Sequence, residues 1–162
     1  MGYEYGIWLV YDKEEFPTTH IGHITITCYM EKEDAISLYD ELFKIYGKHH
    51  EVYVDCKNPL KFDINMYEND DNELYSWGYE GHLLENGMMT DIWSNIAKIS
   101  KKYKCDFSHT PHTSMFYSHI KQALQTHKMD ENKVVKCSME VVDITSDDPV
   151  DWHVIELSNK FI

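Results

Sequence analysis

HITIT, residues 23–27, is the stretch from which we predict the fold and the site, and PHTSMFY, residues 111–117, repeats its form. Each is typical of a short strand that carries a His, then one apolar or β-branched residue, then a Thr or Ser. Because side chains alternate faces along a strand, His23 and Thr25 would share one face. In the second stretch His112 and Ser114 would share a face in the same way. If the two strands lie side by side, two imidazoles and two hydroxyls look into one cleft.

Such a cleft has the groups that phosphodiester cleavage needs. Two imidazoles on opposite sides of one phosphate, from His23 and His112, can act as base and acid near neutral pH without a metal ion. The hydroxyls of Thr25 and Ser114 can donate to the phosphate oxygens, where negative charge grows. The sequence leaves open which His is the base. The alternative for each His taken alone is a hydrogen-bonded structural role.

The paired tetrads resemble the HxTx signatures of the 2H phosphoesterase superfamily, the LigT-like and cyclic phosphodiesterase proteins. Here they read His23-Ile24-Thr25-Ile26 and His112-Thr113-Ser114-Met115, the second with Ser in place of Thr. The resemblance implies a two-lobed α+β fold in which antiparallel sheets form a central cleft with helices outside, over one domain of residues 1–162. The lead into the first tetrad, YGIWLVYD, is similar to that of phage anti-immune nucleases that degrade cyclic nucleotide messengers.

Composition limits the partners. A chain of 162 residues with 43% hydrophobic residues suits one globular domain, and its net charge of −13 disfavours a large nucleic-acid or anionic-membrane surface. The four Cys are widely spaced without a CxxC pair, so we expect reduced thiols and no zinc site built on them. For the proposed two-His chemistry we expect no metal or other cofactor. No apolar run is long enough for a membrane span. We expect a cytoplasmic monomer that binds a small nucleotide, and the residue usage is compatible with a viral protein acting in a host cytoplasm.

Hydrophobic periodicity predicts a mixed order of strands and helices. Strands are predicted over residues 5–11, 52–56, 60–67, 74–82, 134–144 and 152–157, besides the two motif strands. Helices are predicted over 31–46, where Gly47 follows, over 91–104 and over 118–128. The acidic segment 68–73 is expected to be a solvated turn, because it lacks the ligand spacing of a calcium loop.

Substrate-binding residues are less well defined. We expect Tyr11 and Trp152 at the rim of the cleft as platforms for a nucleotide base, out of six candidate aromatics that also include Trp8. Lys13 could meet a second phosphate, and Glu140 could recognise a base edge or orient a His. Any of these side chains could instead be ordinary core or surface groups.

The remaining histidines are expected outside the site. His20 and His109 each precede a motif His by three positions and are predicted to lie in loops or at the rim, and His49-His50 in an exposed turn. The spacing of His20 and His23 is metal-like, but no third ligand is evident.

Three functions compete. The first is a metal-independent phosphodiesterase that cleaves a small nucleotide, such as a cyclic di- or oligonucleotide immune messenger. The second is an enzyme that opens 2′,3′-cyclic phosphates, processes RNA ends or cleaves 2′,5′-oligoadenylate. The third is a non-catalytic nucleotide-binding module.

Overall fold

The protein is described by a computed structural model that covers residues 4–12, 14–16, 18, 20–64, 74–85, 87–89, 91–118, 128–146 and 148–157. Its strands are β1 (Tyr5–Tyr11), β2 (His23–Met30), β3 (His49–Val54), β4 (Leu60–Ile64), β5 (Leu74–Glu85), β6 (Met88–Met89), β7 (Asp106–Phe107), β8 (His112–Ser118), β9 (Lys133–Asp143) and β10 (His153–Val154). Its helices, within these ranges, are α1 (Lys32–Tyr46), α2 (Ile92–Ser100) and the short 3-10 helix η1 (Pro149–Asp151).

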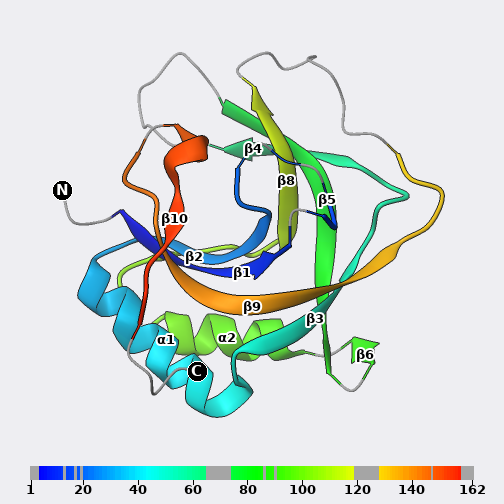
Figure 1. The fold of residues 1–162 in the computed structure, drawn as a ribbon. Coiled ribbons are helices and arrows are strands. Elements are labelled where there is room, and N and C mark those ends of the chain that lie inside the picture. Colours follow the sequence, from blue (N-terminus) through cyan, green and yellow to red (C-terminus); the bar gives the residue numbers. More distant parts are fainter. Residues whose placement is uncertain are drawn as a thin grey trace.

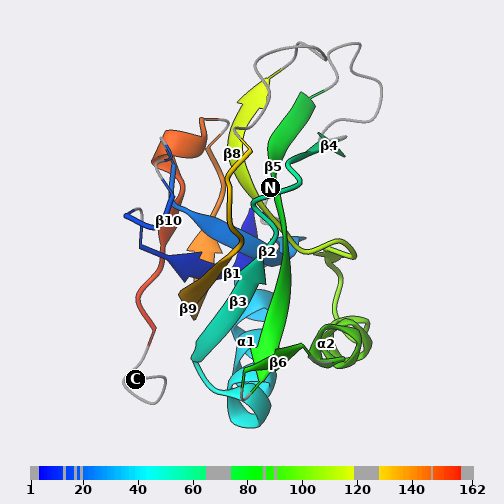
Figure 2. The same ribbon diagram turned by 90° about the vertical axis from the view of Figure 1, so that its right-hand side faces the viewer.

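Six strands form a closed antiparallel barrel in the order β1-β2-β8-β5-β3-β9. The pairing of β1 with β9 closes it, and β9 is long enough to pair with both β1 and β3. The short strands β4 and β6 pair with β5, β7 with β2, and β10 with β9. Figure 1 shows the barrel above helices α1 and α2, and Figure 2 shows the same arrangement from the side.

The predicted two-lobed α+β fold with helices outside two sheets is wrong. The two motif strands, one of which the two-lobed fold assigns to each lobe, pair with each other as β2 and β8, and the pairing of β9 with β1 closes the sheet on itself. Within the described part of the chain, α1 and α2 pack against each other, and α1 packs against β1 and β9. The physical reason is that alternation identifies a strand and its buried face, but it does not select the strand's partner.

Helix α1 follows its predicted signals closely. Ala35, Leu38, Tyr39 and Leu42 are buried at helical spacing, and Glu33 and Asp34 lie in the first turn, where carboxylates favour the helix dipole. Gly47 ends the helix with a φ of 76°, a conformation that favours glycine, and its N–H donates to the Phe43 carbonyl oxygen.

Several other element predictions are corrected. Residues 49–50 begin strand β3 and do not form an exposed turn, the second helix ends at Ser100, and the last predicted strand is reduced to β10 after η1. The predicted helix over 118–128 and the acidic turn over 68–73 lie almost entirely outside the described residues. None of the described helices is both long and apolar enough to cross a membrane.

The core lies on one face of each barrel strand. Ile7 and Leu9 of β1, Ile24 and Ile26 of β2, and Met139 of β9 belong to one cluster of buried side chains, which also contains the buried face of α1. Since strand side chains alternate, the residues between them project from the opposite face. His23 and Thr25 of the first tetrad, and His112 and Ser114 of the second, belong to that opposite face.

Candidate functional site

The two motif strands lie side by side, which is the condition for a shared cleft, although the two-lobed fold would place them in separate lobes. β2 and β8 pair antiparallel with Ile24 opposite Thr113. Because partners in an antiparallel ladder run in opposite directions, one step along each strand places His23 opposite Ser114 and Thr25 opposite His112. These four side chains, which we call the motif face, share one side of the sheet.

The opposite side of the same strand pair is core. Ile24 is buried there, and Thr113 accompanies it, with its Oγ1 hydrogen-bonded to the hydroxyl of Tyr11. Tyr11 is only 4% exposed and its ring lies 5.6 Å from that of Phe16. The expected rim position of Tyr11 is therefore wrong, because the side chain points into the core and away from the motif face.

His23 is held in one orientation. Its Nδ1–H donates to the carbonyl oxygen of Ile21 at 2.6 Å, so in the neutral ring Nε2 is the nitrogen that accepts a proton. The indole of Trp8 stacks on the imidazole, with ring centroids 3.4 Å apart and planes 5° from parallel. Trp8 is 2% exposed and His23 is 4% exposed, so the pair is nearly enclosed.

Enclosure changes the acidity of His23. Burial lowers the pKa of the imidazole to about 3, because the charged form loses hydration, and the nearby His20 and His112 charges act in the same direction. The hydrogen bond to Ile21 opposes this shift and is the weaker effect. His23 is therefore neutral near pH 7, which is the form that a general base requires.

His112 makes the same local hydrogen bond as His23 but has different neighbours. Its Nδ1–H donates to the carbonyl oxygen of Thr110 at 2.8 Å, two residues upstream, as His23 donates to Ile21. Burial lowers the pKa of His112, while the Thr110 carbonyl and the charge of Glu80 oppose the shift. Glu80 of β5 lies opposite His112 in the strand pairing. A carboxylate beside this imidazole favours its protonated form.

Two predicted substrate-binding residues lie near the motif face. Trp152 has its ring centroid 6.4 Å from that of His23 and 5.7 Å from that of Trp8, and its Nε1–H donates to Ser146 O at 2.7 Å. Glu140 of β9 lies opposite Trp8. A carboxylate oxygen of Glu140 lies 3.2 Å from Lys48 Nζ, so this group is part of an ion pair.

Lys13 lies outside the described residues. The residues that are described therefore bring Trp152 and Glu140 towards the two tetrads and leave Tyr11 in the core.

We compared the chain with models of known protein families, with curated proteins and with solved structures. None of the three comparisons found a match. The resemblance to the 2H superfamily thus depends on the two tetrads alone, and the barrel fold gives it no support.

Two residues of the site carry more weight than the sequence suggested. Trp8 was one of six candidate base platforms, but its ring covers His23. His20 lies in the loop before β2, as predicted, but it is not at a rim, since it is 7% exposed and its ring centroid lies 5.7 Å from that of His23. The available signal was the spacing of His20 and His23, which indicates proximity without requiring a metal. Among the described residues, no three His, Cys, Asp or Glu side chains gather in a way that could hold a metal ion.

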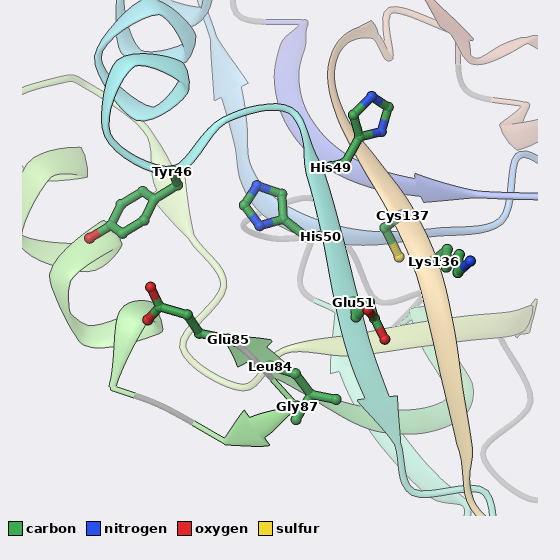
Figure 3. A pocket seen from close by; sticks show the side chains of 9 residues that line it. All are labelled: Tyr46, His49, His50, Glu51, Leu84, Glu85, Gly87, Lys136 and Cys137. Atoms are coloured by element: carbon green, nitrogen blue, oxygen red, sulfur yellow. The ribbon is translucent and has the colours of Figure 1, made fainter.

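An open cavity of about 520 Å³ lies away from the motif face, against β3, β9 and the C-terminal end of β5. Figure 3 shows that His50 and Glu85 extend beside Tyr46, whereas His49 projects from the other side of β3. The Nε2–H of His50 donates to Gly47 O at 2.9 Å, and burial lowers the pKa of this imidazole. No residue of the motif face lines this cavity.

Proposed function

We propose that the protein is a metal-independent phosphodiesterase that cleaves a phosphodiester bond of a small nucleotide, with a cyclic di- or oligonucleotide messenger as the first candidate substrate. The observation that supports this proposal is the antiparallel pairing of the two tetrads. It sets His23 against Ser114 and His112 against Thr25, so that the two imidazoles occupy diagonal corners of one face. A phosphate over the centre of that face would meet an imidazole on each side.

In the proposed reaction His23 is the base. Its Nε2 takes the proton from the attacking hydroxyl, either the ribose 2′-hydroxyl next to the scissile bond or a water molecule. The attacking oxygen forms a bond to phosphorus and the bond to the leaving oxygen breaks. The hydrogen bond to Ile21 supports this role, since it commits Nδ1–H and leaves Nε2 to accept the proton. Enclosure by Trp8 keeps the ring neutral, but the lowered pKa also makes it a weaker base.

His112 is the acid that protonates the leaving oxygen. Glu80 supports this assignment, because its carboxylate opposes the loss of the imidazolium proton. The hydroxyls of Thr25 and Ser114 donate to the two non-bridging oxygens, where negative charge increases in the transition state. Both hydroxyls lie on short strands of a closed sheet, which limits the reorganisation needed during the reaction.

Trp152 is the proposed platform for a base. Stacking of a base on an aromatic ring contributes about 1–3 kcal/mol and tolerates different bases. The net charge of −13 supports a small ligand, since a long polyanion binds through many phosphate contacts.

A turnover panel with chelator present tests the proposal. Cyclic dinucleotides, cyclic trinucleotides, 2′,5′-oligoadenylate and 2′,3′-cyclic mononucleotides are offered to the wild type and to His23→Asn and His112→Asn. The Asn amide can replace the Nδ1–H donor of each ring but supplies nothing at Nε2. We expect chelator-resistant cleavage of one substrate class, reduced about 100- to 10,000-fold in each variant.

His109→Asn is the matched control, because this exposed His precedes the second tetrad and its ring packs on Phe107 with centroids 5.2 Å apart. Cleavage of the 2′,3′-cyclic or 2′,5′-linked substrates alone would move the assignment to those classes. A folded wild type that cleaves nothing in the panel would contradict the enzymatic proposal and leave a nucleotide-binding module.

A further inference from the structure

His20 occupies an unusual place for a loop histidine. It lies three residues before His23, and the rest of the loop holds it, since Thr18 Oγ1–H donates to the His20 carbonyl oxygen at 2.6 Å. The imidazole is buried, and burial lowers its pKa below the ordinary value. A buried, neutral imidazole must satisfy its N–H with a protein acceptor.

That acceptor belongs to the other tetrad. The Nε2 of His20 lies 3.1 Å from the backbone carbonyl oxygen of Ser114. A carbonyl only accepts, so Nε2 carries the hydrogen, the opposite tautomer to that of His23. This bond joins the loop that enters β2 to the motif residue of β8. The two motif strands already pair at Ile24 and Thr113, and the bond from His20 to Ser114 adds a second link between them.

His20 also borders the ring of His23 directly. The two imidazoles meet edge to face, with planes at 74°. Trp8 covers one face of His23, and Trp152 approaches His20 and His23 at the same centroid distance of 6.4 Å. Among the described residues, the rings of Trp8, Trp152 and His20 border His23, and the ring of His20 is bonded to the opposite motif strand.

The second tetrad has no equivalent arrangement among the described residues. His109 stands at the same spacing from His112 as His20 from His23, but it is exposed and packs on Phe107. The two halves of the motif face therefore differ in this histidine, although their tetrads are alike.

We propose that His20 is a positioning residue, which fixes the distance between the His23 imidazole and the Ser114 hydroxyl by bonding the Ser114 backbone and bordering the His23 ring. The inference depends on the proposed phosphodiesterase function for its effect on turnover. Its geometric part, the bond from His20 Nε2–H to Ser114 O, stands independently of any activity.

Replacement of His20 by Gln or by Asn distinguishes a positioning role of this side chain from a role that requires only its burial. In His20→Gln the side-chain N–H₂ reaches the place of Nε2 and can still donate to Ser114 O. In His20→Asn the amide reaches only the place of Nδ1 and the bond is lost. We expect kcat of His20→Gln to stay within about threefold of wild type, and kcat of His20→Asn to fall about 10- to 100-fold with KM nearly unchanged, because small displacements of reacting groups slow the chemical step. His109→Asn is the control for removal of an imidazole.

Imidazole NMR gives a readout that does not require turnover. Long-range ¹H–¹⁵N correlations of the wild type should show His20 protonated at Nε2 and His23 at Nδ1. The His23 signals should shift in His20→Asn and stay in place in His20→Gln. A wild-type His20 protonated at Nδ1, or equal effects of the Asn and Gln substitutions, would overturn the inference. If the tautomers and shifts are as expected but no substrate turns over, the proposed function fails and the geometric link is retained.

Discussion

The enclosed His23 makes a quantitative prediction about stability. Its folded-state pKa of about 3 lies below the ordinary value of 6.5, because the folded protein disfavours the charged ring. Between these two pH values the unfolded chain binds a proton at this position that the folded chain does not. The free energy of unfolding therefore decreases as the pH falls through this window, and the contribution is complete only above pH 6.5.

The size of the effect follows from the shift. Each pH unit below 6.5 lowers the free energy of unfolding by about 1.4 kcal/mol for one such group. At pH 5 the loss attributable to His23 is about 2 kcal/mol, which is a large part of a typical domain stability. His20 and His112, whose pKa values are also lowered, add losses of the same sign that remain in any His23 variant.

His23→Asn isolates the contribution of His23. The Asn amide can still donate to Ile21 O, but it cannot take up a proton. We expect the variant to be less stable than the wild type at pH 7.5, since the stack with Trp8 is lost, and the difference to shrink by about 2 kcal/mol at pH 5. Urea unfolding followed by circular dichroism at several pH values between 7.5 and 5 measures both curves.

The control is His109→Asn, which removes an imidazole from an exposed position. Parallel curves for the wild type and His23→Asn across this range would refute the reasoning, because they would show that His23 takes up its proton equally in the folded and unfolded chains.

Three further predictions follow from the same geometry. In the proposed reaction His23 must be neutral and His112 protonated, and the lowered pKa values of both place the maximum of kcat/KM below pH 6.5. An optimum above pH 7.5 in initial-rate assays would contradict the proposed roles. A Cβ at Gly78 would lie 1.8 Å from a backbone carbonyl oxygen of β8, so Gly78→Ala should lose about 3 kcal/mol or more in urea unfolding. Gly87→Ala, with a φ of +78° but nothing within 4 Å of the new Cβ, should lose only about 1 kcal/mol, and equal losses would argue against the close approach. Trp152→Ala should raise KM about 5- to 150-fold for the substrate that the panel identifies, and an unchanged KM would remove this residue from the base-binding role.

Local patterns in the sequence predicted the strands of the site but not the architecture that contains them. The alternation in residues 23–27 and 112–118 specifies which side chains share a face, but the direct pairing of the two motif strands was a condition of the predicted cleft and not a prediction. The closure of the barrel depends on β9, which pairs with β1 on one side and β3 on the other. Pairing choices of this kind arise from the packing of the whole core, and no short pattern in β9 encodes them.

The misplacement of Tyr11 has a specific cause. Residues 7–11 are apolar at every position, so alternation cannot say which set faces the core. In the structure Ile7, Leu9 and Tyr11 take the core side, and Trp8 takes the motif side and covers His23. The position at the end of the strand suggested a rim, but the hydrogen bond to Thr113 holds the Tyr11 ring inside.

The difference between the two histidines is also a consequence of tertiary structure. Their tetrads are nearly interchangeable as sequence, and each ring donates Nδ1–H to the carbonyl two residues upstream. What distinguishes them is contributed by other strands: Trp8 of β1 encloses His23, and Glu80 of β5 faces His112. Burial lowers the pKa of both rings, and the carboxylate facing His112 opposes that shift, so in the proposed reaction neighbours distant in the sequence distinguish the base from the acid. If the proposed reaction holds, a change of those neighbours would exchange the two roles with both tetrads left intact.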